Sequence, residues 1–103
     1  MVVGFNVSGQ KVLEKYNLPM VLEETSGLTV CNDTLWTHND SGGEATLYAI
    51  STKGKLLAKK KLYNHKNIDW EDMATDRGKL FVADIGNNFG TRKNLYVLEI
   101  AMT

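Results

Sequence analysis

The chain has 103 residues, of which 43% are hydrophobic, and its 12 Lys and Arg residues balance 12 Asp and Glu residues. That length suits one small domain with a modest core, and the neutral charge excludes a general nucleic-acid binder, which would be clearly basic. The only cysteine, Cys31, cannot form an intrachain disulfide. No apolar run is long enough for a membrane span, and the N-terminus lacks the pattern of a signal peptide. We therefore expect a soluble, cytoplasmic protein, or an exported one if a leader has been removed, with no nucleic-acid or membrane partner.

Short runs rich in β-branched and aromatic residues, separated by turn signals such as Ser41-Gly42-Gly43, predict an all-β chain. The predicted strands lie near residues 2–7, 10–17, 25–31, 34–39, 45–51, 54–63, 70–75, 79–84 and 93–101. One alternative stays open, because Val12, Leu13 and Tyr16 also have helical spacing, which would make residues 11–16 a short helix. Pro19 ends that segment in either case.

The second half of the chain repeats the first at a constant distance. The following pairs of residues lie 45 positions apart: Gly9 and Gly54, Glu24 and Asp69, Leu28 and Met73, Leu35 and Leu80, and Trp36 and Phe81. The pair Leu47-Tyr48 recurs as Leu95-Tyr96, 48 positions later, which indicates a three-residue insertion within residues 87–92. A period of this length, filled with short strands, is typical of the blades of a β-propeller.

The sequence therefore predicts an all-β single domain over residues 1–103, built of two tandem four-stranded antiparallel repeats that resemble propeller blades, at about residues 3–47 and 48–95. Two blades of four strands each leave one predicted strand surplus, either 2–7 or 93–101. A propeller needs at least about four blades to close. We therefore expect oligomerisation, with a terminal strand of one copy entering the blade of its neighbour. Three copies, giving six blades, are favoured, and two copies are the alternative.

Acidic residues gather at the expected strand ends. Glu24 and the pair Glu71 and Asp72 precede or begin the first strand of a repeat, and Asp84 ends another strand. The first strand of each propeller blade lines the central channel, so these carboxylates would converge there from different blades. Such an oxygen-rich site suits Ca²⁺, and crowded carboxylates can also raise one pKa and provide a general base. Asp84, like Asp40, is also a good turn former, so a structural role stays open.

Candidate ligand-binding residues are His38, Asn39 and Asp40, which follow one another at a strand end, and Trp70, which stands beside the acidic pair. For His38, a satisfied and half-buried position is the alternative. Trp36 and Phe81 occupy equivalent repeat positions, so both are expected to pack between blades.

Several enzyme signatures are missing from the sequence. It has no Gly-x-Ser-x-Gly nucleophile elbow, no phosphate-binding glycine loop and no His-Glu-x-x-His motif. Nothing in the sequence pairs Cys31 with a histidine, which argues against a cysteine nucleophile.

Several motifs occur together within residues 18–100: Ser26-Gly-Leu, Asn39-Asp-Ser-Gly, Leu47-Tyr, Asp69-Trp-Glu-Asp-Met-Ala, Phe81-Val-Ala-Asp-Ile-Gly-Asn-Asn and Arg92. This string resembles a family of bacterial six-bladed β-propellers of the SdiA-regulated type, which implies a propeller fold and little about activity. A more distant similarity, to calcium-dependent lactonase propellers, implies that Glu24, Glu71, Asp72 and Asp84 hold a metal on the propeller axis. The chain departs from both groups because it holds two repeats and no export signal.

Two functions of different class follow from these observations. The first is a non-catalytic binding or scaffold module of the propeller type, which assembles with itself into a ring and binds a small molecule or a protein. The alternative is a Ca²⁺-dependent hydrolase acting on lactones or phosphoesters, with an acidic metal site formed across subunits. A relic with neither ring nor activity is a third interpretation. Ca²⁺ is the one cofactor that the residues suggest.

Overall fold

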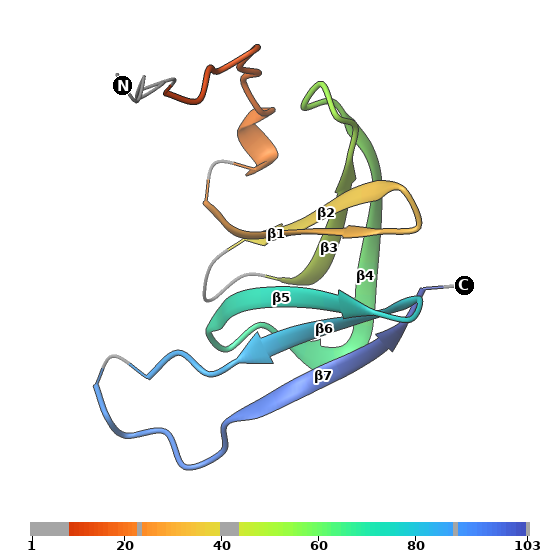
Figure 1. Cartoon of the computed structure of the whole chain (residues 1–103). Coiled ribbons are helices and arrows are strands. Elements are labelled where there is room, and N and C mark those ends of the chain that lie inside the picture. Colours follow the sequence, from red (N-terminus) through yellow and green to blue (C-terminus); the bar gives the residue numbers. More distant parts are fainter. Residues whose placement is uncertain (1–8, 23, 40–43, 88, 103) are drawn as a thin grey trace, which may run out of the picture.

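The computed structural model of the protein describes residues 9–22, 24–39, 44–87 and 89–102. Within these ranges, a 3₁₀ turn (η1, Met20–Leu22) precedes the strands β1 (Thr25–Cys31), β2 (Thr34–Asn39), β3 (Glu44–Ile50), β4 (Leu56–Lys66), β5 (Trp70–Asp76), β6 (Lys79–Asp84) and β7 (Tyr96–Ala101). Strands β1 to β4 pair in sequence order as antiparallel sheet A, and β5 to β7 pair in the same way as sheet B (Figure 1). The prediction of an all-β protein is confirmed.

The strands expected from residue 25 onward are found close to their predicted bounds. The strand predicted over 10–17 is wrong, and so is its helical alternative, because residues 9–19 have no regular secondary structure. A strand needs a neighbour for its backbone hydrogen bonds, and this segment pairs with neither sheet, although Tyr16 and Leu18 lie against sheet A. The earlier part of the described segment points away from both sheets (Figure 1). The strand predicted over 2–7 lies outside the described residues. Sheet B has three strands in the described part of the chain, rather than the four expected of a repeat.

Two tight turns of the same kind close the first hairpin of each sheet. Asn32 and Asp33, between β1 and β2, have φ values of 51° and 63°. Arg77 and Gly78, between β5 and β6, have φ values of 50° and 75°. Two successive residues of positive φ match the right-handed twist of the strands that they connect. The turns therefore fix the same pairing register in both hairpins.

The repeat seen in the sequence is also present in the strand register. Each β1–β2 pair recurs 45 residues later as a β5–β6 pair: Thr25↔Asn39 corresponds to Trp70↔Asp84, and Thr29↔Trp36 to Ala74↔Phe81. A β-bulge interrupts both ladders at the equivalent place, after Thr25 and after Trp70. A bulge adds one residue to one strand and breaks the alternation of its side chains. For this reason Trp70 and Met73, three residues apart, are both buried in the core.

The third strands are related by a longer distance. The pair His38↔Leu47 corresponds in register to Ala83↔Val97, so β7 follows β3 at 50 residues. The connection before β7 is therefore five residues longer than its counterpart. The expected three-residue insertion is wrong, because Leu95, matched to Leu47 by sequence, lies outside β7.

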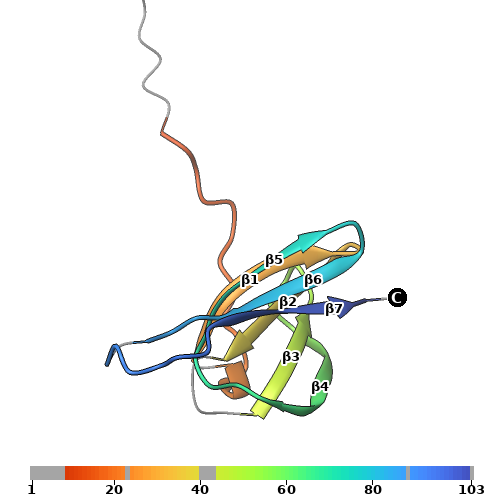
Figure 2. The same ribbon diagram turned by 90° about the horizontal axis from the view of Figure 1, so that it is seen from below.

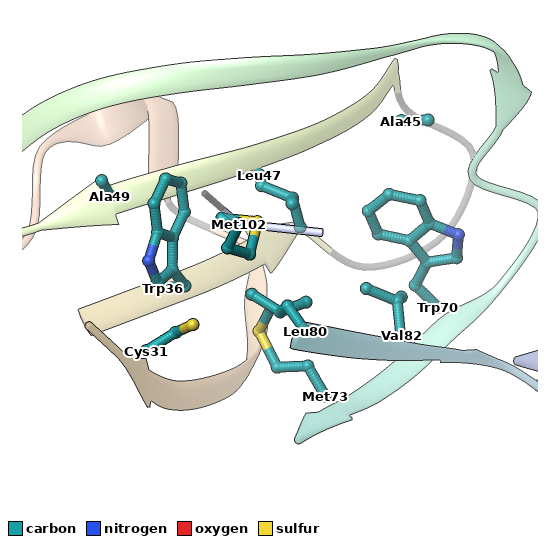
Figure 3. Packing of buried hydrophobic residues seen from close by; sticks show 10 residues of the cluster. All are labelled: Cys31, Trp36, Ala45, Leu47, Ala49, Trp70, Met73, Leu80, Val82 and Met102. Carbon is teal, nitrogen blue, oxygen red and sulfur yellow. The ribbon is translucent and has the colours of Figure 1, made fainter. Parts of the chain in front are cut away.

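The main core lies between the two sheets. Its buried side chains are Cys31, Trp36, Ala45, Leu47, Ala49, Trp70, Met73, Leu80, Val82 and Met102. Trp36 and Trp70 stand at opposite ends of this cluster, with Leu47, Met102 and Leu80 between them (Figure 3). We call the two faces that meet here the inner faces of sheets A and B. The first strands β1 and β5 lie side by side (Figure 2), and the hydroxyl of Thr75 on β5 donates to the carbonyl of Val30 on β1 at 2.7 Å.

A smaller apolar cluster covers part of the opposite face of sheet A, which we call its outer face. Leu22 of η1 packs there against Tyr48 and Ile50, with Leu35 and Leu56 at the margin. The outer face of sheet B, which carries Phe81, has no covering segment in the described part of the chain. The fold therefore consists of two equivalent sheets that share one buried contact and each direct a further face away from it.

Gly27 tests the close contact at the β1 bulge. A Cβ at this position would lie 2.5 Å from Nε2 of His38, whose side chain is fully buried. We expect Gly27→Ala to lower the free energy of unfolding by about 2 kcal/mol through overpacking, measured by denaturant titration. Gly9→Ala is the matched control, because nothing lies within 4 Å of the added Cβ. Equal stability of the two variants would contradict the contact.

Candidate functional site

A buried polar cluster lies where sheets A and B meet at one end. His38, at the end of β2, and Trp70, at the start of β5, are both fully buried, and their rings meet edge to face at 5.7 Å. Nδ1 of His38 lies 2.8 Å from the carbonyl oxygen of Asn39. Because that oxygen can only accept, Nδ1 must carry the hydrogen. In the described structure, Nε2 of His38 and Nε1 of Trp70 are buried without a hydrogen-bond partner.

Two asparagines join this cluster to the backbone of both sheets. Nδ2 of Asn67 donates to the carbonyl of Asn39 at 3.0 Å, and Oδ1 of Asn67 accepts from the backbone N–H of Trp70 at 2.9 Å. Nδ2 of Asn39 donates to the carbonyl of Val21 at 3.2 Å. The bond to the N–H of Trp70 is buried, and leaving such a group unpaired costs about 1–3 kcal/mol. The cluster thus connects the entry to β1 with the entry to β5.

The structure brings together three of the four predicted ligand-binding residues: His38, Asn39 and Trp70. Asp40 lies outside the described residues. The side chains of His38 and Trp70 have no exposed surface, so a ligand could reach them only if the two sheets separated locally. Ligand binding at these residues stays a prediction. Sequence reasoning missed Asn67, which has no distinguishing signal within its polar loop.

Asp84 and Arg92 form a second buried polar group, at the end of β6. NH1 of Arg92 donates to Oδ1 of Asp84 at 2.7 Å and to the carbonyl of Gly86 at 3.0 Å. The backbone N–H groups of Ile68 and Asp69 donate to Oδ2 and Oδ1 of Asp84 at 3.3 and 3.0 Å. Asp84 thus has a structural role, but its backbone donors belong to the connection before β5 and not to the local turn that the sequence left open. A metal ion there would have to displace these donors and would meet the guanidinium charge.

The same group holds the long connection that follows β6. The N–H of Gly86 donates to the carbonyl of Asp69 at 3.0 Å, and a Cβ on Gly86 would collide with the side chain of Asp69. The backbone N–H of Arg92 donates to Oδ1 of Asn87 at 3.0 Å. Arg92 was among the residues of the propeller-like motifs, but its role as the partner of Asp84 could not be inferred without the fold.

The three other predicted metal ligands lie near the start of the first strands. Glu24 immediately precedes β1, while Glu71 and Asp72 lie at the β5 bulge, and all three side chains are exposed. Oδ1 of Asp72 accepts from the N–H of Met73 at 2.8 Å. No group of three or more His, Cys, Asp or Glu residues that could hold a metal ion occurs within the described ranges. A site completed by carboxylates from several subunits stays a prediction.

Each outer sheet face carries an apolar pocket. On sheet A, a pocket of about 340 Å³ lies between Tyr16 and Leu18 of the N-terminal segment and Thr25, Leu28 and Ile50 of the sheet. On sheet B, a pocket of about 220 Å³ is lined by Asp72, Met73, Ala74, Phe81, Ala83 and Val97. Leu28 and Val97 are 60% and 58% exposed. Such contiguous apolar surface marks an interaction site more often than a free surface.

Comparison with known proteins gives no match: no protein family, no curated protein and no solved structure is similar to this chain. Among the described residues, no helix has the length and apolar character needed to cross a membrane.

Loss of the Arg92 cation should be costly, because the Asp84 carboxylate has no exposed surface. Removing one partner of a buried pair leaves an uncompensated charge, so we expect Arg92→Ala to destabilise the protein by about 3 kcal/mol. The control is Arg77→Ala, which removes an arginine whose side chain is 91% exposed and should change stability by under about 0.5 kcal/mol. Thermal or denaturant unfolding measures both variants, and similar losses in the two would refute a special role for Arg92.

Proposed function

We propose that this protein is a non-catalytic binding or scaffold module whose copies stack sheet against sheet, in the manner of propeller blades, into a closed ring. Three copies, giving six sheets, are favoured, and two copies are the alternative. The observation that carries the proposal is the equivalence of the two sheets: the face of sheet A that is buried inside the molecule corresponds, residue by residue, to the face of sheet B that is left outside.

The aromatic residues of the repeat illustrate this equivalence. Trp36 lies on the inner face of sheet A and is buried against sheet B. Phe81 takes the same place in the ladder of sheet B, opposite Ala74, but alternates with the core residues Leu80 and Val82 and so points away from sheet A. A third sheet placed on Phe81 would repeat the contact that Trp36 already makes.

The complementary surface lies on the outer face of sheet A. Leu28 and Val30 of β1 are 60% and 55% exposed. Their counterparts in β5 are Met73, which is buried against sheet A, and Thr75, whose hydroxyl donates to β1. The outer face of sheet A is thus the equivalent of the inner face of sheet B. If the outer face of sheet A in one copy packs on the outer face of sheet B in another copy, the contact between sheets A and B is reproduced.

Physical chemistry favours such an assembly. Burying apolar surface contributes about 25 cal/mol for each Å² removed from water. The contact joins two different faces, so it is head-to-tail, and a head-to-tail contact whose rotation closes gives a ring instead of an open filament. The same two faces would be used by every copy, which leaves no unpaired sheet face in the closed ring.

A pocket for a small molecule would persist within this contact. In the contact between sheets A and B of one copy, the rings of His38 and Trp70 fill the space that corresponds to this pocket. The register places Ala83 and Thr25 at the equivalent positions of the contact between copies. Both are small, and Thr25 already lines the 340 Å³ pocket on sheet A. A small, largely apolar ligand is the class of molecule that this space would accept.

The assembly is tested by charging one face. Phe81→Lys should preserve the fold, because the new cation would lie opposite Glu99 of β7, but it would place a charge in the contact between copies. We expect the native mass from light scattering to fall from that of an oligomer to that of one chain. The control Leu57→Lys adds the same charge at an exposed position of β4, the edge strand of sheet A, and should leave the mass unchanged.

A single-chain mass for the unaltered protein at high concentration would refute the assembly. A mass that falls equally in the Phe81 and Leu57 variants would show a general effect of charge and would count against the sheet-face contact.

The Ca²⁺-dependent hydrolase is the second candidate, and one observation favours it. Strands β1 and β5 lie side by side, and Glu24, Glu71 and Asp72 are exposed where these two strands begin. A ring would bring the same end of every first strand toward one axis. Carboxylates gathered there would be hard oxygen ligands for Ca²⁺, which could polarise an ester or lactone carbonyl.

Calcium binding is tested by melting temperature. A ligand that binds only the folded state stabilises it by about 2.7 kcal/mol at 100 times its dissociation constant, which raises the melting temperature by several degrees. We expect this rise with millimolar Ca²⁺ if the candidate is correct, and its loss in the double variant Glu71→Gln and Asp72→Asn. The control Asp76→Asn, at the far end of β5, should retain the rise. An unchanged melting temperature in the unaltered protein removes this candidate.

A further inference from the structure

The outward edge of β7 has no partner strand in the described structure. In sheet A the corresponding edge of β3 is covered by β4, which pairs with it from Ile50↔Leu56 to Glu44↔Lys66. In sheet B the order ends at β7. An edge strand presents a row of unpaired N–H and C=O groups, which is a template for pairing with another segment.

The N-terminal segment is the counterpart of β4. Gly9 matches Gly54 at the 45-residue period, which sets residues 11–17 against residues 56–62 of β4. Both segments lead, through a buried residue, into the first strand of the next sheet: Leu22 before β1 and Asn67 before β5. By the logic of the repeat, residues 10–17 hold the sequence position of a fourth strand in a sheet that would precede sheet A.

The described part of its own chain contains no such sheet for this segment. Val12 and Leu13 are 79% and 88% exposed, and residues 9–19 form no strand. The segment leaves the molecule on the side of sheet A that faces away from sheet B, whereas β7 lies on the opposite side (Figure 1). Sheets A and B both stand between the segment and the free edge. The partner that fits the edge is therefore the segment of a second copy.

We infer that residues 10–17 of one copy pair antiparallel with the free edge of β7 in another copy and complete its sheet B. This inference rests on the proposed assembly and names the segment that closes it. A sheet extended in this way gains main-chain hydrogen bonds along the whole edge. In the same contact, sheet A of the donor follows its segment onto the outer face of the acceptor's sheet B.

The pairing register can be transferred from sheet A. There, Ala49 pairs with Ala58 and Leu47 with Lys60. Adding 50 to a β3 residue number gives its counterpart in β7, and subtracting 45 from a β4 residue number gives its counterpart in the N-terminal segment. Glu99 is then opposite Leu13 of the second copy, and Val97 is opposite Lys15 of the second copy. This register also reproduces one side-chain contact, since Nζ of Lys60 lies 5.9 Å from the ring centre of Trp36. Lys15 of the second copy would lie over Phe81, the counterpart of Trp36, as a cation–π pair.

A cysteine pair tests this register. In a Cys31→Ser background, copies carrying Leu13→Cys are mixed with copies carrying Glu99→Cys and oxidised mildly. Opposed strand positions fall within the Cα separation that a disulfide requires, so we expect a crosslinked dimer at a yield about tenfold above the control. The control replaces Leu13→Cys by Glu14→Cys, which shifts the thiol by one residue to the opposite side of the donor strand. Equal yields in the two mixtures, or no crosslink in either, would falsify the inference.

Two further variants separate this inference from the proposed assembly. Glu14→Pro removes a backbone N–H from the donor segment, and Glu14→Ala is its control. Loss of the oligomer in both Glu14→Pro and Phe81→Lys, with Glu14→Ala unaffected, supports strand donation and face stacking together. Loss in Phe81→Lys alone overturns strand donation and leaves the assembly standing. Loss in Glu14→Pro alone supports strand donation and overturns face stacking.

Discussion

The contact between the inner faces of sheets A and B is the interaction on which the rest of the structure depends. Trp36 and Leu47 on one side and Met73, Leu80 and Val82 on the other exclude water from the only extensive core of the described chain. An isolated sheet of three or four strands gains stability only by burying a face. Because two equivalent sheets meet through non-equivalent faces, the contact buries one face of each and directs another outward. The exposed Leu28 and Val97 follow from that geometry and not from a poorly formed core.

Polar residues hold the two sheets at the place where the chain passes between them. Asn67 and Asp84 accept hydrogen bonds from the backbone just before and at the start of β5, and Arg92 neutralises the buried carboxylate of Asp84. Buried backbone groups need a hydrogen-bond partner, and here the side chains of Asn67 and Asp84 provide it. Asn67, Asp84 and Arg92 are therefore occupied by structural bonds. The acids at the β5 bulge, Glu71 and Asp72, are in contrast exposed.

Local patterns were sufficient to predict the strands from residue 25 onward, because alternation and turn residues act within a few positions of one another. The same patterns failed for residues 10–17, since a strand forms only where a partner edge exists, and that partner is not encoded nearby. The length of the connection before β7 was also misjudged, because matching Leu95 to Leu47 by type ignored the bonds with which Arg92 shapes that loop. Three of the residues predicted to bind a ligand, His38, Asn39 and Trp70, lie together in the structure. The complete burial of the His38 and Trp70 rings could not be predicted from the residue types.

The sequence by itself determined the all-β class, the 45-residue repeat and the equivalence of Trp36 and Phe81, since these depend on residue order and spacing alone. Only the tertiary structure decided which member of each equivalent pair is buried. Trp36 is buried and Phe81 lies on an outer face because a sheet follows the first and the described chain places none over the second. Identical local patterns have different surroundings in the two sheets, and burial is a property of those surroundings.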